Sequence, residues 1–166
     1  MTKKKDKNTS DKSKNPRATY NITGVAGEYF VAAELSRRGW IATLTLKNTP
    51  NIDVVATTPD GRRTLSIQVK TMSIGNRQGW FLTKGIESIV SSNKFYIAFV
   101  DLKGKNEQPD YFLIPKNLFA RWVSKRHKKW LVTPGRHGRM HVDNPIRAFD
   151  KPQFSAFEKY HNNWDI

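Results

Sequence analysis

The pattern of apolar and polar residues predicts β-strands in three runs in the first half of the chain. These runs are WIATLTL (40–46), NIDVVATT (51–58) and RTLSIQVKT (63–71). In the third run, apolar residues at 65, 67 and 69 point to one face and polar residues at 66, 68 and 70 to the other. Turn-forming residues Pro59-Asp60-Gly61 separate the last two runs, which predicts a β-hairpin.

Two longer segments have the composition and spacing of helices. The first runs from Thr23, a candidate N-cap, to Gly39, a candidate C-terminal cap. The second covers 116–131 and predicts an inward stripe of apolar side chains opposite a basic face. The stripe consists of Phe119, Trp122 and Val123.

The remaining segments complete an α/β pattern. Strands are predicted over GWFLT (79–83), KFYIAFVDL (94–102) and DYFLIP (110–115), and a last helix over 154–164. Residues 85–94 fit either a loop or a helical turn, and 133–145 are loop-like. The length of 166 residues suits one sizeable core, so we expect one domain over residues 18–166.

Charge points to a polyanionic partner. The 166 residues contain 29 Lys and Arg against 14 Asp and Glu, a formal net charge of +15. Residues 1–17 hold seven of the basic residues and almost nothing apolar, which predicts a disordered basic arm. Nucleic acid, above all DNA, is the favoured partner, and an anionic membrane surface is the weaker alternative. For the arm itself, DNA tracking and mere solubilisation are equally compatible with the sequence.

Other compositional features concern location. No apolar run approaches the roughly 20 residues of a membrane span, and the N-terminus lacks the apolar segment of a secretory signal. We therefore expect a cytoplasmic protein that does not bind membranes. Cysteine is absent, which excludes disulfides and thiolate metal sites. A homodimer is compatible with the sequence.

One acid, Asp53, stands between apolar neighbours at the start of the predicted hairpin. A two-residue turn at Asp60-Gly61 would place Asp53 directly across from Gln68. A three-residue loop that includes Pro59 would shift the register and place Asp53 beside Ile67, unless a bulge restores the face. The sequence leaves both registers open.

A second acid, Glu28, shares the apolar face of the first predicted helix. Buried carboxylates need a partner or a metal ion. Glu34 has Arg37 and Arg38 at the spacing of ordinary surface pairs, so it is interpreted as the structural acid of the two. The chemical grouping is therefore Glu28, Asp53, Gln68 and Lys70.

Acids that converge with a lysine suit phosphodiester hydrolysis. Hard oxygen ligands hold Mg²⁺, the metal ion activates a water, and a lysine adds positive charge near the reacting phosphate. The competing interpretation is a solvated sheet face, because alternating polar residues on strands are common.

The segments AGEYFVAAELSRRGW, NIDVVA and LSIQVKT resemble the PD-(D/E)XK nuclease superfamily, in particular its small single-domain members. The similarity is clear over residues 24–71 and loose over 95–130. It implies a restriction-endonuclease-like core, a central mixed β-sheet flanked by helices, with a metal site at one edge of the hairpin. It matches Asp53 to the motif aspartate, Lys70 to the motif lysine and Glu28 to the helix glutamate.

Gln68 stands where an acid is most common in that superfamily. The resemblance implies a Mg²⁺-dependent DNA endonuclease, with Mn²⁺ able to substitute, whose ligands are Asp53, Gln68, the Val69 carbonyl and Glu28. The glutamine removes one negative charge, so a catalytically inactive nucleic-acid-binding protein stays an alternative. A nuclease component of a defence or toxin system is a third.

Basic residues elsewhere predict contacts with nucleic acid. They are Arg121, Lys125 and Lys128 on the second helix, and Arg136 and Arg139 in the loop that follows it. In the same loop, His137 and His141 have a spacing seen in zinc sites, but the two further ligands of a tetrahedral site are missing nearby. We therefore interpret this loop as a contact to nucleic acid.

Overall fold

The structure is a computed structural model that describes residues 16–46, 49–76 and 78–166. All but the last two residues of the predicted basic arm lie outside this part. Those two, Pro16 and Arg17, open helix α1 (Pro16–Arg37), which therefore begins seven residues before the expected start at Thr23. A proline suits the first helical turn because no intrahelical partner is needed there for an N–H group. Gly39 follows the helix with φ +84°, as expected for a C-terminal cap.

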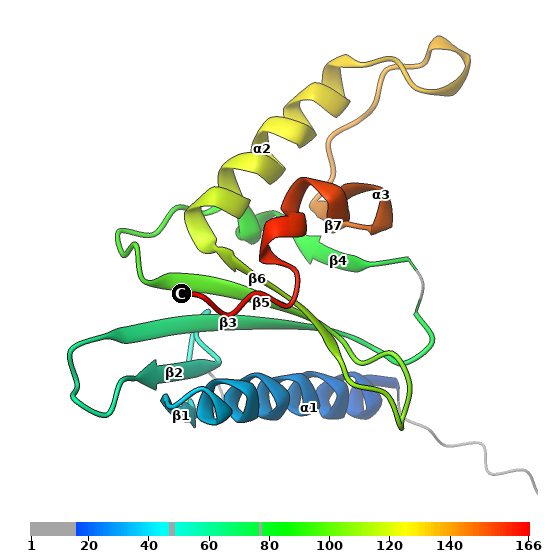
Figure 1. Cartoon of the computed structure of the whole chain (residues 1–166). Coiled ribbons are helices and arrows are strands. Elements are labelled where there is room, and N and C mark those ends of the chain that lie inside the picture. The colour runs from blue at the N-terminus through cyan, green and yellow to red at the C-terminus, as the bar shows by residue number, and fades with distance from the viewer. Residues whose placement is uncertain (1–15, 47–48, 77) are drawn as a thin grey trace, which may run out of the picture.

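A five-stranded mixed sheet lies next to α1 (Figure 1), as the sequence predicts. Its strand order is β1-β2-β3-β5-β6. Strands β3 and β5 are parallel, and all other neighbours are antiparallel. The strands are β1 (Ile41–Leu44), β2 (Val54–Thr57), β3 (Thr64–Met72), β5 (Phe95–Asp101) and β6 (Asp110–Pro115).

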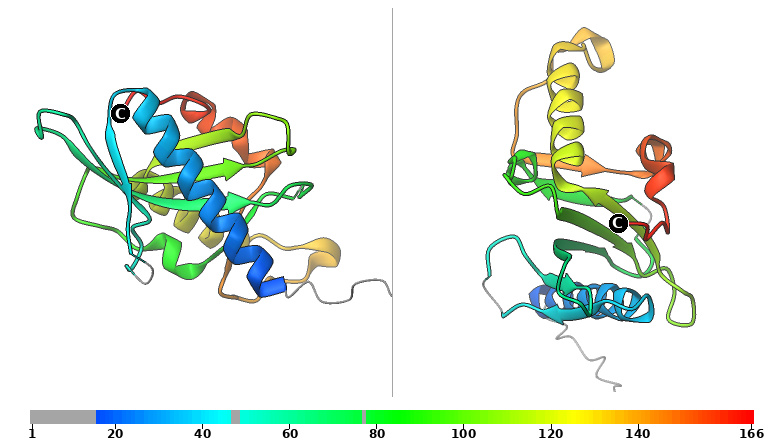
Figure 2. Two further views of the ribbon diagram at one scale, coloured as in Figure 1. Left: turned by 90° about the horizontal axis from the view of Figure 1, so that it is seen from below. Right: turned by 60° about the vertical axis from the view of Figure 1, so that its left-hand side comes forward.

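The two faces of this sheet carry separate hydrophobic cores. On one face, Val31 and Leu35 of α1 pack against Leu65, Ile67 and Val69 of β3. The other face packs against helix α2 (Lys116–Val132), which projects away from the sheet, and against the C-terminal segment (Figure 2). The predicted stripe on α2 is confirmed, because Phe119 and Val123 are buried and Trp122 packs against the same core.

The C-terminal third differs from the prediction. Strand β7 (Ile146–Phe149), which the sequence pattern did not reveal, pairs antiparallel with β4 (Trp80–Thr83) in a second, two-stranded sheet. The predicted last helix is only helix α3 (Lys151–Phe154) followed by the 3₁₀ helix η3 (Ser155–Tyr160). The segment 85–94, for which the sequence allowed a loop or a helical turn, begins within the 3₁₀ helix η1 (Lys84–Glu87). In the described part of the chain, no helix is long and apolar enough to cross a membrane.

The hairpin between β2 and β3 settles the register that the sequence left open. Val54 pairs with Ile67, and Thr57 pairs with Thr64. The Thr58 N–H donates to the Arg63 carbonyl, so four residues form the loop and the register equals that of a two-residue turn. Asp53 nevertheless lies outside β2. Its N–H donates to the Ile67 carbonyl at 2.9 Å, so Asp53 and Val54 both lie opposite Ile67, as in a β-bulge.

Candidate active site at the fork between β2 and β3

The bulge at Asp53 is where β2 separates from β3, and we call the group of Asp53, Gln68, Val69 and Lys70 the β2–β3 fork. The Asp53 carboxylate replaces the missing backbone partner of β3, because its Oδ2 accepts the Val69 N–H at 2.7 Å. In a strand, the N–H and C=O of one residue point to the same side. The Val69 carbonyl therefore faces the fork as well, beside the Asp53 carboxylate.

Gln68 is buried and has a fixed amide orientation. Its Nε2 donates to Oδ1 of Asn51 at 3.3 Å. Asn51 adopts φ 62°, a left-handed conformation that asparagine tolerates better than most residues. With the amide nitrogen directed at Asn51, the carbonyl oxygen is the end of Gln68 that can meet a cation.

Lys70 is half-buried and lines the same cavity as Gln68. This fork pocket has a volume of about 210 Å³, and its walls come from Asn51, from β3, from β4 and from η1. Within the part of the chain that the structure describes, no hydrogen bond or ion pair involves Lys70. A second cavity of about 260 Å³ lies on the other side of Lys70, toward Thr23 and Gly24 of α1. Lys70 therefore stands between two cavities with its charge uncompensated by those residues.

Glu28 lies on α1, which packs against the face of the sheet opposite to Gln68 and Lys70. Residues 65, 67 and 69 of β3 face α1, whereas Gln68 and Lys70 point away from it. The two elements are in close contact at Gly27, where an added Cβ would lie 2.9 Å from Cβ of Thr71. Glu28 follows this contact directly and is half-buried. The structure thus unites Asp53, Gln68, Val69 and Lys70 at the fork, and places Glu28 on the helix that packs behind it.

The expectation that Glu34 forms only surface pairs is wrong. The predicted partners are correct, since Arg37 donates to the Glu34 carboxylate at 2.7 Å and Arg38 also pairs with it. Glu34 is, however, 9% exposed and is more deeply buried than Glu28. Burial raises the pKa of Glu34, but hydrogen bonds and charge from Arg38 and Arg37 outweigh it and hold the pKa below its usual value. Glu34 is thus a buried structural acid.

Sequence reasoning missed two supports of the fork pocket. Asn51 orients Gln68, and only its tolerance of left-handed backbone conformations could have indicated this from the sequence. The buried Lys116 donates to the carbonyls of Ile86 and Ser88 at 2.6 and 2.7 Å, and so holds η1 as one wall. Burial lowers the pKa of Lys116.

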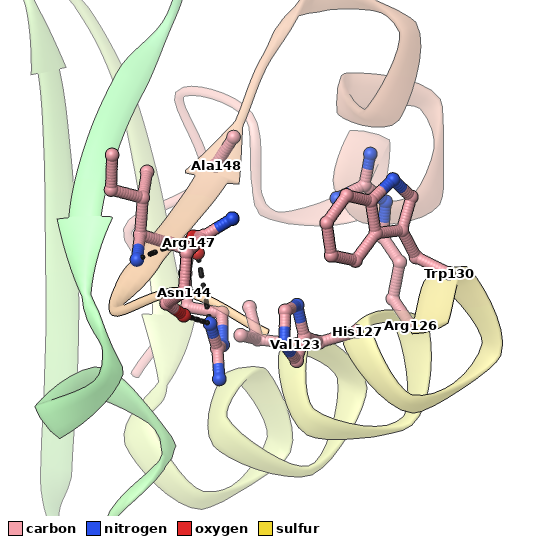
Figure 3. A pocket seen from close by; sticks show the side chains of 8 residues that line it. Val123, Arg126, His127, Trp130, Asn144, Arg147 and Ala148 are labelled. Carbon is pink, nitrogen blue, oxygen red and sulfur yellow. Dashed lines mark hydrogen bonds between the residues drawn. The ribbon is translucent and has the colours of Figure 1, made fainter. Parts of the chain in front are cut away.

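A cavity between α2 and β7, which we call the cavity beside α2, is different in character. It measures about 280 Å³ and lies between α2 and the segment 144–148 (Figure 3). Arg147 is buried there, pairs with Glu87 and donates to the carbonyls of Asn144 and Ile146. His127 pairs with Asp143 at 2.8 Å, which holds the pKa of Asp143 below its usual value. These polar groups bind one another and anchor α2 to β7.

The basic residues predicted to contact nucleic acid fall into two groups. Arg121, Lys125 and Lys128 are exposed and line one shallow cavity on α2 together with Glu87 and Ile89. Arg136 and Arg139 are exposed in the loop beyond the far end of α2 (Figure 1). His141 of that loop stacks on Trp130, with ring centroids 4.1 Å apart.

The oxygen donors at the fork fit a hard cation. They comprise one carboxylate, one amide carbonyl and one backbone carbonyl, all of which are ligand types that Mg²⁺ accepts. Among the described residues, no three His, Cys, Asp or Glu side chains are grouped to hold a metal ion. Any cation at the fork would thus depend on neutral carbonyl oxygens as well as on Asp53.

Two solved structures show partial similarity to this mixed sheet flanked by helices. Similarity was found to the structure of Hjc, a Holliday junction resolvase from Archaeoglobus fulgidus, at 16% sequence identity and a TM-score of 0.46, over 80% of this chain and 88% of the resolvase. Similarity was also found to the bacterial homing endonuclease I-Ssp6803I, at 15% identity and a TM-score of 0.45, over 61% of this chain and 72% of the endonuclease. No family model and no curated protein matches the chain.

Proposed function

We propose that the protein is a Mg²⁺-dependent endonuclease that hydrolyses DNA phosphodiester bonds, with Mn²⁺ able to substitute. The observation that carries the proposal is the position of Lys70. It is a half-buried cation without a partner among the described residues, and it shares a pocket with Gln68 at the fork where Asp53 is fixed by a strand N–H. Buried charges are normally paired, so this lysine has the properties of a group that awaits a phosphate.

Each fork residue has a role in this proposal. The Asp53 carboxylate and the carbonyls of Gln68 and Val69 would hold the metal ion, with Glu28 as a direct or water-mediated ligand. The bound ion would polarise the phosphate and lower the pKa of a water molecule. Lys70 would position that water or stabilise the negative charge that develops on the phosphate.

The basic face of α2 supports DNA as the substrate. The fork pocket reaches Gly85 and Ile86 of η1, and the cavity lined by Arg121, Lys125 and Lys128 begins at Glu87 of the same short helix. Residues of η1 thus line both cavities. A DNA backbone that follows α2 would therefore pass from these phosphate-binding cations directly to Lys70, and Arg136 and Arg139 would extend the track beyond the end of α2.

The predicted basic arm is a further part of the proposed DNA-binding surface. We propose that residues 1–17 act as a basic arm that tracks DNA, and that 18–166 form the nuclease-like domain. The last two residues of the arm, Pro16 and Arg17, open α1 at the end of the helix that carries Thr23, and Thr23 lines the second cavity beside Lys70. The positive charges of the arm would thus add to phosphate binding close to the fork.

A second candidate, DNA binding without cleavage, is favoured by Gln68. A neutral amide at this position leaves Asp53 as the single acid of the fork itself, which weakens the attraction for Mg²⁺. The two candidates share the DNA-binding surface and differ only in turnover.

Cleavage assays separate these candidates. Linear, nicked, single-stranded and branched DNA would be incubated with the protein in Mg²⁺, in Mn²⁺ and in EDTA. We expect cleavage that requires the metal ion. Lys70→Ala should abolish cleavage and retain DNA binding and the melting temperature, because it removes a charge from the reacting phosphate and breaks no hydrogen bond or ion pair among the described residues.

The matched control is Lys105→Ala, which removes an equal charge from an exposed loop and should leave cleavage unchanged. A Lys70→Ala variant that cuts DNA as fast as the wild type would contradict the proposed role. An inactive wild type that Gln68→Glu does not revive would favour binding without cleavage.

A further inference from the structure

Phe81 is the most exposed of the nine phenylalanines, with 64% of its surface accessible. It lies on β4, where Trp80 and Leu82 on either side point inward and are buried. Phe81 occupies the outward position of the strand, and its cross-strand partner is only the small side chain of Ala148. A polar residue is usual at such a position, as Thr83 shows two residues later. The fold itself therefore gives no reason for an aromatic ring here.

The ring stands beside the proposed reaction centre. Phe81 and Lys70 both line the fork pocket, together with Gln68, and both also line the second cavity toward α1. A cation suited to a phosphate thus lies next to an exposed aromatic face. A nucleotide has the complementary pair of groups, a phosphate joined through its sugar to a base with two flat faces.

Only a base with an exposed face can stack on the ring of Phe81. Inside a continuous duplex, both faces of every base are covered by its neighbours, whereas an unpaired base exposes its faces and can stack on an aromatic side chain. From this geometry we propose that Phe81 stacks on an unpaired base next to the phosphate held by Lys70. The preferred substrate is then DNA with an unpaired nucleotide at the cleavage position. This inference rests on the proposed nuclease function and defines its substrate class.

The first test measures stacking without turnover. The protein in EDTA would be irradiated with duplex DNA that carries a single unpaired 5-iodouracil, a base that cross-links to aromatic rings stacked on it, and the adduct would be located by mass spectrometry. We expect the cross-link on Phe81. The same base placed in a paired position should give little adduct.

The second test measures substrate preference. Cleavage of a duplex with one unpaired nucleotide would be compared with cleavage of the fully paired duplex. The wild type should favour the former by on the order of tenfold or more, which is the range of a base–aromatic stacking contact. Phe81→Ala should remove the preference and Phe81→Trp should retain it. The control is Phe30→Ala, because Phe30 is 41% exposed on α1 and lines neither cavity.

The outcomes separate this inference from the proposed function. If the wild type cuts DNA but Phe81→Ala keeps the full preference, or if the cross-link lies on another residue, the stacking role is overturned and the nuclease function stands. An equal loss on paired and unpaired substrates would mean that Phe81 wedges into intact duplex, which also overturns it. If the wild type cuts nothing, the nuclease proposal fails, and the cross-link with the relative affinities for the two DNAs still decides whether Phe81 binds an unpaired base.

Discussion

The fork pocket and the cavity beside α2 each contain a cationic side chain that is at least half-buried. They differ in whether other groups of the protein compensate its charge. Beside α2, Arg147 is held by Glu87 and by two backbone carbonyls. At the fork, Lys70 has no such partner among the described residues. A buried charge without a partner destabilises the folded protein. Such a charge is therefore typical of a site where a ligand supplies the partner. The candidate site therefore differs from the structural anchor in the pairing of its cation and not in the size of its cavity.

The largest expected difference is between the stabilities of Arg147→Ala and Lys70→Ala. Arg147→Ala leaves Glu87 without its counter-charge, and we expect a loss of about 3 kcal/mol in the free energy of unfolding. Lys70→Ala breaks no hydrogen bond or ion pair among the described residues and should change the same quantity by less than about 0.5 kcal/mol. Denaturant titrations of both variants would measure this, and equal destabilisation would remove the distinction between the two cavities.

The fork could be predicted from the sequence because its residues are close together along the chain. Alternation in one strand placed Gln68 and Lys70 on one face, and the hairpin brought Asp53 to that strand. The bulge could not be predicted, since it depends on whether the Asp53 side chain or the backbone meets the Val69 N–H. Periodicity and the predicted hairpin therefore indicated which residues meet at the fork and left their register open, and only the resemblance to a nuclease superfamily suggested a role for them.

The cavity beside α2 could not be predicted for a related reason. Strand β7 buries Arg147 and Phe149, so its inward positions do not form an apolar alternation. Arg147 can be buried only because Glu87, 60 residues earlier in the chain, pairs with it. Long-range pairing of this kind leaves no local pattern. The same limitation applied to Glu34, whose burial depends on the packing of α1 against the sheet.

The packing of α1 behind the fork can be tested at two glycines of the same helix. At Gly27 an added Cβ would lie 2.9 Å from Cβ of Thr71, whereas at Gly24 it would meet nothing within 4 Å. We expect Gly27→Ala to destabilise the protein by about 2 kcal/mol through overpacking. Gly24→Ala should be neutral or stabilising by up to about 1 kcal/mol, because alanine favours helix. Thermal unfolding would compare them, and equal effects would contradict the close approach at Thr71.

Asn51 provides a smaller test inside the fork pocket. Asn51→Gly keeps the left-handed backbone conformation and removes the acceptor that orients the Gln68 amide. Loss of such an orienting contact typically weakens metal binding about tenfold, and calorimetric titration with Mn²⁺ would measure it.

Gln68→Glu serves as the reference for Asn51→Gly. It adds a negative charge at the fork and should tighten Mn²⁺ binding. An Asn51→Gly variant with unchanged affinity would mean that Asn51 does not orient a ligand.

The smallest expected effect separates the two acids of α1. Glu34 is buried with Arg37 and Arg38, so Glu34→Gln should lower the free energy of unfolding at pH 7 by about 1 kcal/mol. Glu28→Gln should instead reduce metal-dependent cleavage more than Glu34→Gln does, if Glu28 is a ligand. Cleavage rates and melting temperatures of the two variants would show whether their effects fall on different measurements. Equal, small effects on cleavage would remove Glu28 from the proposed site.

The pH dependence identifies the cause of the Glu34 effect. The folded-state pKa of Glu34 lies below the ordinary value of 4.5, so the folded protein favours the ionised carboxylate. The stability that Glu34 contributes is therefore complete above the unfolded-state pKa and is lost as the pH falls through the lower folded-state pKa. The difference in melting temperature between the wild type and Glu34→Gln should be constant from pH 7 to about pH 5 and should shrink below about pH 4.5. A difference that stays constant through pH 3 would attribute the effect to packing of the side chain and not to its ion pairs with Arg37 and Arg38.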